Sequence, residues 1–332
     1  MKIACLGAGA WGFCLAYLLI EKAYDVKVWT GNLTLAELLQ RGDKHPKLPS
    51  HSATKRPFMT TDLAEALTDV DLIVESVTSK GLRPVLQQVV ATGKDVPALV
   101  ITSKGIEQNS GLLLSEVAMD VFGADAKNRI GCLSGPSLAD EVMRKLPTSV
   151  VCSAYDETMM LKLCKVFATP FFRVYPNADV KGVSFGGAMK NIIAIACAIS
   201  DGLGMGENTK AALMTRGLHE MRKLGVAVGC SGETLSGLAG MGDLCATCLS
   251  TSSRNYLFGK FLAAGLSPEE AKEKVGMVVE GAYTCVSALQ LGQKMGIPLP
   301  ITAVVHAIIY EQLDPREAVE SLLARAIKLE HL

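Results

Sequence analysis

The fold of this chain is decided by the segment Lys2-Ile-Ala-Cys-Leu-Gly7-Ala-Gly9-Ala-Trp-Gly12-Phe-Cys-Leu-Ala-Tyr-Leu-Leu-Ile20. Its residues 3–6 form a short, unbroken apolar run, as in strands that are buried on both faces. Three glycines follow with the spacing G-x-G-x-x-G, and the apolar residues beyond them recur with the period of one helix face. A strand, a glycine turn and a helix in this order predict a dinucleotide-binding element.

Each glycine of this turn has an expected role. Gly7 permits the tight turn, Gly9 lets the backbone approach a pyrophosphate, and Gly12 lets the helix pack on the strand. The first N–H groups of the helix and its dipole then favour the phosphates. A secretory signal peptide is the alternative interpretation. It is disfavoured because Lys2 is the one basic residue before the apolar segment, which is little for the charged start of a signal peptide. The glycines also interrupt the apolar helix that such a signal needs.

The composition of the 332-residue chain argues against several classes of function. Lys plus Arg and Asp plus Glu number 33 each, so the net charge of zero argues against a nucleic-acid partner or an anionic membrane surface. The longest apolar run, Ile192–Ile199, is far shorter than the roughly 20 residues that cross a bilayer. We therefore expect a core helix there and no membrane insertion.

The ten cysteines lie mostly in apolar runs, as expected of buried thiols in a reducing, cytoplasmic compartment. Cys245-Ala-Thr-Cys248 is the one C-x-x-C motif, and no second pair completes a zinc site. The sequence therefore predicts no metal.

The order of the predicted elements indicates two domains. Strands alternate with helices as far as about residue 175, which predicts an α/β fold with a doubly wound, Rossmann-type sheet and a site at the carboxyl ends of its strands. The segment 42–60, with three prolines, is expected to be a loop. Beyond a boundary near 176–186 only helical patterns recur, so the predicted domains are 1–180, dinucleotide-binding, and 181–332, an all-α domain for substrate and catalysis. The helices predicted in the second domain are Ala188–Ile199, Lys210–Leu224, Tyr256–Ala264, Pro268–Val275, Ala282–Met295, Ile301–Glu311 and Pro315–Ile327.

The end of the second predicted strand, Asp25–Trp29, leaves the choice of cofactor open. An acid at this point would bind the ribose hydroxyls of NAD, and an arginine would bind the extra phosphate of NADP. The strand is followed by Thr30-Gly31-Asn32, which supplies neither. We therefore expect either NAD or NADP to serve as cofactor.

Lys190 is the first candidate for a catalytic residue. It is expected near the N-terminal end of a helix that is apolar on every face and hence buried all round. Burial and the helix dipole would both lower the pKa of its ammonium, as a general base near neutral pH requires. A solvated surface lysine is the alternative.

A second candidate site combines Asp243 with Ser253-Arg254-Asn255. Serines before a helical pattern predict an N-cap, and Arg and Asn beside the first N–H groups of a helix suit a phosphate or another anion. A capped and solvated helix start is the alternative. Glu280 is an acid in an apolar neighbourhood that needs a partner if it is buried, with a surface turn as its alternative.

Taken together, the motifs of this chain resemble one family, the bacterial-type NAD(P)-dependent sn-glycerol-3-phosphate dehydrogenases. The resemblance covers nearly the whole length, and the motifs in this order are highly specific. They are Gly7-Ala-Gly-Ala-Trp-Gly12, Ser103-Lys-Gly105, Ser134-Gly-Pro-Ser137, Gly186-Gly-Ala-Met-Lys-Asn191, Thr215-Arg-Gly-Leu218, Gly242-Asp-Leu244, Ser253-Arg-Asn255 and Val279-Glu-Gly281.

The resemblance implies an oxidoreductase that interconverts dihydroxyacetone phosphate and sn-glycerol 3-phosphate with NAD(P)H, for glycerophospholipid synthesis in lipid metabolism. It implies Lys190 as the catalytic residue that takes the C2 hydroxyl proton, and a homodimer is one expected assembly. The implied substrate-binding residues are Lys104, Gly135, Ser137, Lys190, Asp243, Ser253, Arg254 and Asn255. The cofactor-binding residues, including the glycines of the turn, are Gly7, Gly9, Ala10, Trp11, Gly12, Lys104, Ala139, Arg254, Val278 and Glu280.

Three departures from the family pattern stand out. Ala10 replaces the serine usual in the glycine turn, Thr30–Asn32 lacks a basic residue, and Leu138 stands where phenylalanine is common. Two other functions are open. One is a β-hydroxyacid dehydrogenase of the same architecture. Its small substrate needs fewer hydrogen-bond donors than a phosphate-bearing substrate would use at Ser253–Asn255. The other is a catalytically silent dinucleotide-sensing protein, which the presence of Lys104, Lys190 and Asp243 disfavours.

Overall fold

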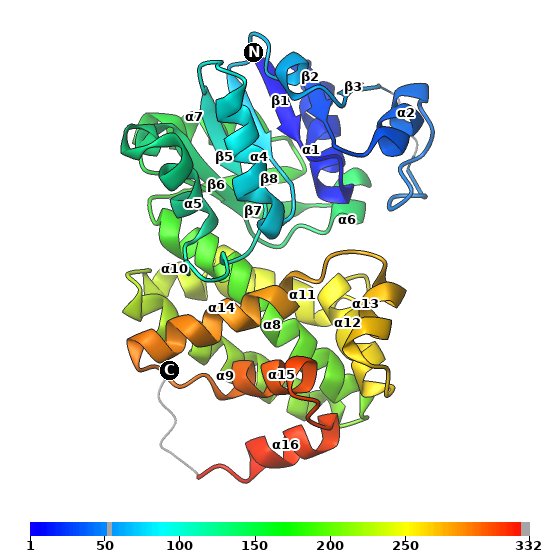
Figure 1. Cartoon of the computed structure of the whole chain (residues 1–332), viewed down its shortest axis with the longest axis vertical. Coiled ribbons are helices and arrows are strands. Elements are labelled where there is room, and N and C mark those ends of the chain that lie inside the picture. Colours follow the sequence, from blue (N-terminus) through cyan, green and yellow to red (C-terminus); the bar gives the residue numbers. More distant parts are fainter. Residues whose placement is uncertain (52–54, 327–332) are drawn as a thin grey trace. The chain divides into compact units, whose positions relative to one another are not determined.

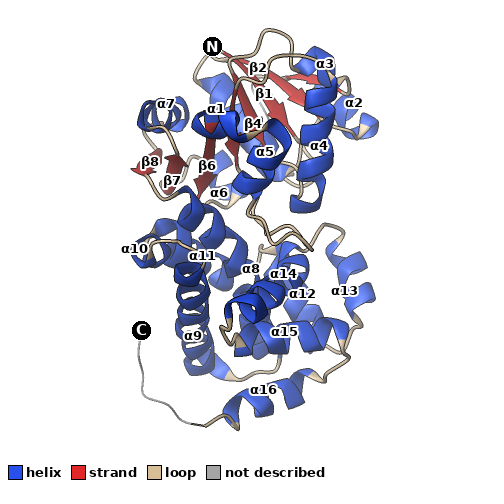
Figure 2. Cartoon of the chain, turned by 60° about the vertical axis from the view of Figure 1, so that its left-hand side comes forward, coloured by secondary structure: helices blue, strands red, loops and turns tan. Residues whose placement is uncertain are grey.

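A computed structural model of the chain describes residues 1–51 and 55–326. They form two compact units, and each is described by itself. The first consists of Met1–Ser103 with Leu114–Val183, and the second of Lys104–Leu113 with the described part of 184–332. Figure 2 shows that the strands belong to the first unit, whereas the described part of the second consists of helices and loops.

The first unit contains one eight-stranded sheet in the order β3-β2-β1-β4-β5-β6-β7-β8. It is parallel from β3 to β6, β7 runs antiparallel to β6, and β8 is parallel to β7. The chain order reverses between β1 and β4, as in doubly wound folds. The strands are β1 Lys2–Leu6, β2 Asp25–Trp29, β3 Phe58–Thr60, β4 Leu72–Glu75, β5 Ala98–Ile101, β6 Ile130–Ser134, β7 Thr148–Ala154 and β8 Phe172–Asn177.

Helices complete the layers of the first unit (Figure 1). α1 packs against α6 and α7, and α4 packs against α5. The core of this unit lies between the central strands and α1, with Ile3, Leu15 and Leu19 fully buried. The helices are α1 Ala10–Glu21, α2 Leu33–Arg41, α3 Leu63–Ala66, α4 Ser79–Ala91, α5 Leu114–Phe122, a 3₁₀ turn Ala124–Arg129, α6 Ala139–Met143 and α7 Glu157–Phe167.

Most of the long α8 belongs to the second unit, whereas its residues 180–183 belong to the first. Its central turns are buried, as their apolar sequence requires. α8 is long and apolar enough to cross a membrane, but 89% of its apolar window is buried within the protein, which is the pattern of a core helix. The helices are α8 Val180–Gly202, α9 Gly206–Ala227, α10 Gly232–Ser236, a π turn Leu238–Gly242, α11 Asp243–Leu249, α12 Arg254–Ala263, α13 Pro268–Val275, α14 Glu280–Met295, α15 Pro300–Tyr310 and α16 Pro315–Leu323.

The structure corrects three expectations. The segment 42–60 was expected to be a loop, but its end forms β3, whose hydrogen bonds go to β2. Lys190 was expected near a helix N-terminus, but α8 begins ten residues earlier, at Val180, so the helix dipole has no part in its titration. α16 begins at Pro315 as predicted but ends at Leu323, before the predicted end at Ile327, which itself lies outside the described residues.

Candidate active site

The glycine turn has the geometry that a pyrophosphate requires. Gly7 has φ +107°, and a Cβ on it would lie 2.6 Å from the carbonyl oxygen of Ser76. A Cβ on Gly12 would lie 2.1 Å from the carbonyl oxygen of Gly7, so strand and helix approach each other too closely for any side chain. Gly9 by contrast has no atom within 4 Å of such a Cβ, which leaves open space in front of the turn.

The start of α1 has no capping side chain. Gly9 is the N-cap residue and makes no side-chain hydrogen bond, and Ala10 in the first turn has no hydroxyl to offer. The orphan N–H groups of a helix start are the donors that phosphate oxygens use. The residues present therefore fit a dinucleotide phosphate.

The residues that follow β2 make hydrogen bonds within the protein. Thr30 is buried, and the Asn32 Oδ1 accepts a hydrogen bond of 2.9 Å from the Leu35 N–H, which caps α2. These side chains thus serve the local fold, and they leave the distinction between NAD and NADP open.

Two lysines of the second unit meet at one carboxylate. Lys190 Nζ donates to Oδ1 of Asp243, and Lys104 Nζ donates to Oδ2 of the same group over 2.6 Å. Lys190 also donates to the Thr247 hydroxyl over 2.7 Å, and that hydroxyl in turn donates to the carbonyl of Asp243. Lys190 and Asp243 are 7% and 1% exposed, so this ion pair is shielded from bulk water.

Burial controls the titration of this cluster. The pKa of Lys190 is lowered from 10.5 to about 8, chiefly by desolvation and also by the charge of Lys104, against the opposing attraction of Asp243. A lysine with this pKa exchanges a proton near neutral pH. The sequence-based expectation of a lowered pKa is confirmed, with burial as its first cause.

The close approach of α8 and the π turn explains why these residues meet. A Cβ on Gly186 would lie 2.5 Å from the carbonyl oxygen of Ala239, so a glycine is required where the two segments touch. Lys190 stands one turn beyond Gly186 on α8, and Asp243 begins α11 directly after the π turn. The first turn of a helix also favours a carboxylate. π turns are frequent at functional sites.

A second cluster joins α8, α12 and α14. Asn255 Nδ2 donates to Asn191 Oδ1 over 2.9 Å, and Asn255 Oδ1 accepts from the Gly281 N–H over 2.9 Å. Ser253 is the N-cap of α12, as predicted, through a bond from the Tyr256 N–H. Glu280 is buried in the first turn of α14, so the alternative of a surface turn is wrong.

Arg254 lies in the first turn of α12 and is exposed. Its Nη1 donates to the carbonyl of Val278 over 3.2 Å, so two of the predicted cofactor residues are in contact. A guanidinium beside an N-terminal helix turn can bind an anion through two parallel hydrogen bonds.

Besides the residues of the glycine turn, three predicted residues belong to the first unit. Ser137 Oγ donates to the Gly135 carbonyl over 2.9 Å. Gly135 has φ +134°, and a Cβ on it would lie 3.0 Å from the Val150 Cα, which explains the glycine. Ala139 begins α6 and packs against the core that includes α1.

Sequence reasoning missed two residues of these clusters. Thr247 follows Asp243 by one helix turn, a spacing that places both on one face, but threonine alone carries little functional signal. Asn191 is the last residue of the motif Gly186-Gly-Ala-Met-Lys-Asn191, but the sequence predicted no role for it. Its hydrogen bond to Asn255 links residues 64 apart in the sequence, which no local pattern predicts.

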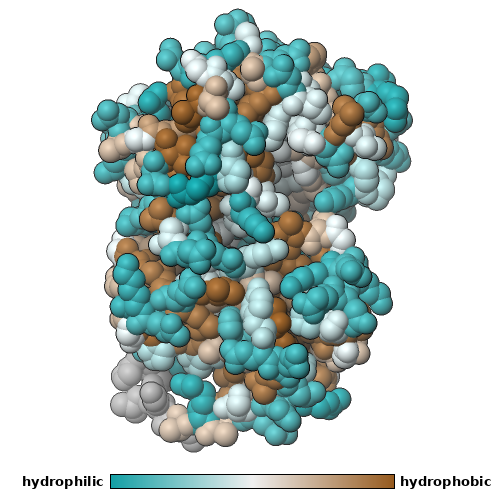
Figure 3. Space-filling view, in the orientation of Figure 1, coloured by the Kyte–Doolittle hydropathy of each residue, from teal (hydrophilic) through white to brown (hydrophobic). Residues whose placement is uncertain are grey.

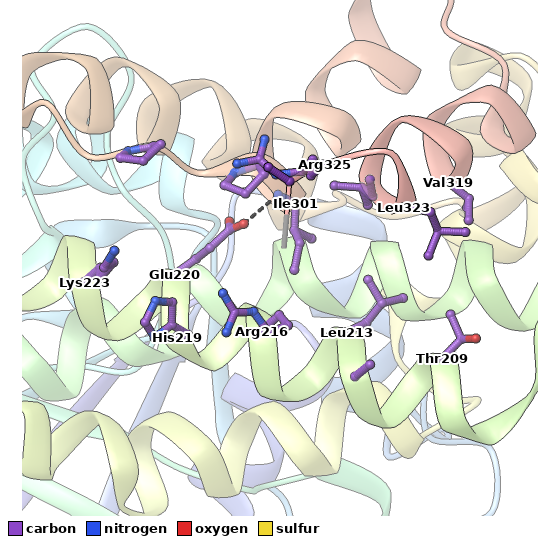
Figure 4. A pocket seen from close by; sticks show the side chains of 15 residues that line it. Thr209, Leu213, Arg216, His219, Glu220, Lys223, Ile301, Val319, Leu323 and Arg325 are labelled. Atoms are coloured by element: carbon purple, nitrogen blue, oxygen red, sulfur yellow. Dashed lines mark hydrogen bonds between the residues drawn. The ribbon is translucent and has the colours of Figure 1, made fainter. Parts of the chain in front are cut away.

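A cavity of about 390 Å³ in the second unit contains none of the predicted site residues (Figure 4). One face of α9, the start of α15 and α16 line it. Glu220 in its wall accepts hydrogen bonds from the N–H groups of Ile301 and Thr302 over 2.6 and 3.2 Å, and so caps α15. Burial raises the pKa of Glu220 to about 7. We place the candidate site at the lysine pair because Glu220 already serves the fold.

Comparisons with known proteins agree on one family. Residues 2–160 match the family model for the NAD-dependent glycerol-3-phosphate dehydrogenase N-terminus, and residues 179–320 match the model for its C-terminus. A glycerol-3-phosphate dehydrogenase (NAD(P)+) of Protochlamydia amoebophila is 57% identical over 331 residues, which cover 100% of this chain and 99% of the relative. One of Chlamydia trachomatis serovar L2b is 53% identical over 330 residues, or 99% of each chain.

Solved structures give the same result. A glycerol-3-phosphate dehydrogenase from Coxiella burnetii has a TM-score of 0.92 at 37% identity, covering 98% of this chain and 99% of that one. A D-mandelate dehydrogenase matches with a TM-score of 0.66 at 15% identity over 96% of this chain and 99% of that one. The second likeness shows the fold alone.

Proposed function

This chain belongs to the NAD-dependent glycerol-3-phosphate dehydrogenase family, and on that premise we propose which of its residues carry the reaction. The reaction interconverts dihydroxyacetone phosphate and sn-glycerol 3-phosphate with NAD(P)H, and its product feeds glycerophospholipid synthesis. The cofactor supplies or accepts the hydride. The protein must exchange a proton with the C2 oxygen, bind a phosphate and hold the dinucleotide.

Lys190 exchanges the proton. In the reducing direction its ammonium donates a proton to the C2 oxygen as the carbonyl becomes a hydroxyl, and in the oxidising direction the neutral amine takes that proton back. The single observation that carries this assignment is the buried Lys190–Asp243 contact, with the pKa of the lysine lowered to about 8. Asp243 supplies one negative charge that both lysines share, and Lys104 holds the substrate beside Lys190.

The substrate phosphate is bound by Ser253, Arg254 and Asn255 at the start of α12, together with Gly135 and Ser137. Support comes from the Ser253 cap and the exposed guanidinium of Arg254, which stand at an N-terminal helix turn. The hydrogen bonds of Asn255 to Asn191 and Gly281 hold this turn against α8 and α14. A small hydroxyacid without a phosphate would not need this set.

The dinucleotide binds at the glycine turn of the first unit. Gly7, Gly9 and Gly12 supply the backbone cradle, and the open space at Gly9 supports this. Within the first unit we also assign Ala10, Trp11 and Ala139 to the cofactor. For Lys104, Arg254, Val278 and Glu280 of the second unit, a cofactor role is what the family resemblance implies. The same proposal includes the two predicted domains: residues 1–180 bind the dinucleotide, and residues 181–332 provide substrate binding and catalysis.

One assay tests the function. Purified protein is mixed with dihydroxyacetone phosphate and either NADH or NADPH, and the loss of reduced-cofactor absorbance is followed. Turnover that needs the phosphorylated ketone supports the proposal. Turnover with a small β-hydroxyacid and its keto form, but none with dihydroxyacetone phosphate, would contradict it. Binding of the cofactor without any turnover would favour a dinucleotide-sensing protein.

A cytoplasmic location and a homodimer complete the proposal. The ten cysteines are free thiols, nine of ten within or close to apolar cores, as in a reducing compartment. Exposed apolar side chains such as Val226, Leu249 and Leu323 could serve a contact between subunits. Sedimentation of the purified protein measures the assembly directly.

A further inference from the structure

Glu75, the last residue of β4, is a buried carboxylate that the proposed reaction does not use. It is 0% exposed. One carboxylate oxygen accepts from the Val77 N–H over 2.7 Å, and the other accepts from the Ser103 hydroxyl over 2.7 Å. Both donors are neutral. Among the described residues, the groups that influence the pKa of Glu75 are likewise neutral hydrogen-bond donors, without a cation.

The backbone around Glu75 lies directly against the glycine turn. A Cβ on Gly7 would meet the carbonyl oxygen of Ser76, the next residue, at 2.6 Å. The Ser76 and Thr102 hydroxyls are 2.6 Å apart, and the Thr102 hydroxyl donates to the Glu75 carbonyl over 2.7 Å. Glu75 therefore joins the ends of β4 and β5 beside the turn.

The order of the strands indicates which half of a dinucleotide lies at the carboxyl end of β4, beside Glu75. In doubly wound folds the dinucleotide lies across the carboxyl ends of the strands, at the point where the strand order reverses, here between β1 and β4. The adenosine ribose is read at the end of the second strand, on the β1–β2 side. The nicotinamide half therefore belongs to the side of β4, β5 and β6, where Glu75 ends the first of these strands.

We propose that Glu75 selects the redox state of the cofactor, and that its carboxylate favours the oxidised form over the reduced one. The nicotinamide ring carries a positive charge when oxidised and none when reduced. A buried carboxylate without a cation near it lacks its complementary charge, which the oxidised ring supplies. The proposal rests on the proposed dinucleotide site, and it goes beyond that site by naming a residue that sets its selectivity.

The selectivity should depend on pH. Burial raises the pKa of Glu75 to about 7, so the carboxylate is ionised above this pH and neutral below it. The titratable groups that face it stay neutral in this range. Burial raises the pKa of the Cys132 thiol on β6 to about 12, and that of the neighbouring Tyr155 also to about 12. His45, whose ring contacts the carbonyl of Ala8 in the glycine turn, has its pKa lowered from 6.5 by burial, so it is mainly neutral above that pH. Among the described groups named here, Glu75 is thus the one whose charge changes around pH 7.

The test is a set of equilibrium dissociation constants for NAD+ and NADH, measured by calorimetry without substrate from pH 6 to 8. For the wild type, the ratio of the NAD+ constant to the NADH constant should fall about tenfold as the pH rises, the size expected for one charge acting across several ångströms of protein. In Glu75→Gln, which keeps the shape of the side chain, the ratio should stay at its high, low-pH value throughout. The NADH constant itself should change less than about twofold.

Glu220→Gln is the matched control, because Glu220 is also a buried carboxylate with its pKa raised to about 7, and it lies in the second unit. This variant should keep the ratio of the wild type at every pH. A Glu75→Gln ratio equal to that of the wild type, or equal weakening of both cofactors, would overturn the proposal. Should Glu75→Gln fail to fold, a flat wild-type ratio between pH 6 and 8 would overturn it as well. A wild type that binds neither form would instead refute the dinucleotide site.

Discussion

The ammonium of Lys190 binds the carboxylate of Asp243 in a site where Asp243 is 1% exposed. A buried lysine is costly unless it is paired, and a buried pair is destabilised strongly when one partner is removed. Here the same carboxylate also binds Lys104, so one negative charge holds two cations. The arrangement keeps Lys190 in the fold while its pKa stays low enough for proton exchange.

Asp243→Asn should therefore destabilise the protein and change the titration of Lys190. The amide keeps the shape of the side chain but leaves both lysines without a counter-charge, so the free energy of unfolding should fall by about 3 kcal/mol. The pKa of Lys190 should fall below that of the wild type, because the attraction that raises it is lost. Urea denaturation measures the first effect. Unchanged stability would mean that the two lysines do not depend on this carboxylate.

The two directions of the reaction should respond to pH with opposite sign. Reduction needs the protonated lysine, so kcat/KM for dihydroxyacetone phosphate should fall as the pH rises through about 8, the pKa of Lys190. Oxidation needs the neutral amine, so kcat/KM for sn-glycerol 3-phosphate should rise through the same pH. Parallel profiles from pH 6 to 10 decide this. If both directions changed with the same sign, Lys190 would not be the proton-exchanging group.

Gly9→Ala should leave the fold intact and abolish tight cofactor binding. A Cβ at this position meets no protein atom within 4 Å, so the alanine costs little in the free protein, but it occupies the space that a pyrophosphate needs. Gly232→Ala is the matched control, because its Cβ would meet no atom closer than 3.7 Å and the residue begins α10 in the second unit, away from the glycine turn in the sequence. NADH binding followed by fluorescence should weaken at least tenfold in the first variant and stay near wild type in the second. Equal binding by both would place the pyrophosphate elsewhere.

Arg254→Lys should impair substrate recognition although it keeps the charge. Lysine cannot reproduce two parallel hydrogen bonds to phosphate oxygens, and charge-assisted bonds of this kind contribute about 1.5–3 kcal/mol. The kcat/KM for dihydroxyacetone phosphate should therefore fall roughly 10- to 150-fold, mainly through KM. Dihydroxyacetone, which lacks the phosphate, should be a very poor substrate of both enzymes. If its turnover fell by the same factor, Arg254 would act on the cofactor or on the fold instead.

Local patterns were sufficient for the first strand, the glycine turn and the first helix. The period of the apolar residues and the spacing of the glycines are properties of neighbouring residues, and the positive φ of Gly7 and the close approach at Gly12 confirm both roles. β3 was missed because it has three residues and depends on pairing with β2 for its hydrogen bonds. The start of α8 was missed because tertiary burial stabilises helical turns that its glycines disfavour.

Lys190, Lys104 and Asp243 were each predicted as residues of the candidate site, but the contacts between them were not. Lys190 and Asp243 lie 53 residues apart, and their contact depends on the close approach that Gly186 allows. No spacing within one element encodes such a contact. Thr247 was missed because a threonine one turn after Asp243 carries little functional signal by itself. Glu75 was missed because a single acid at the end of an apolar strand reveals its burial only when the neighbouring strands are in place.

The most direct test of the account is single-turnover reduction of dihydroxyacetone phosphate by Lys190→Met with NADH already bound. Methionine keeps the apolar length of the side chain and removes the exchangeable proton. We expect NADH to bind with nearly wild-type affinity while the rate of reduction falls by at least about 10²-fold, as is typical when a general acid is lost. A variant that binds NADH and reduces the ketone at nearly the wild-type rate would contradict the assignment of Lys190.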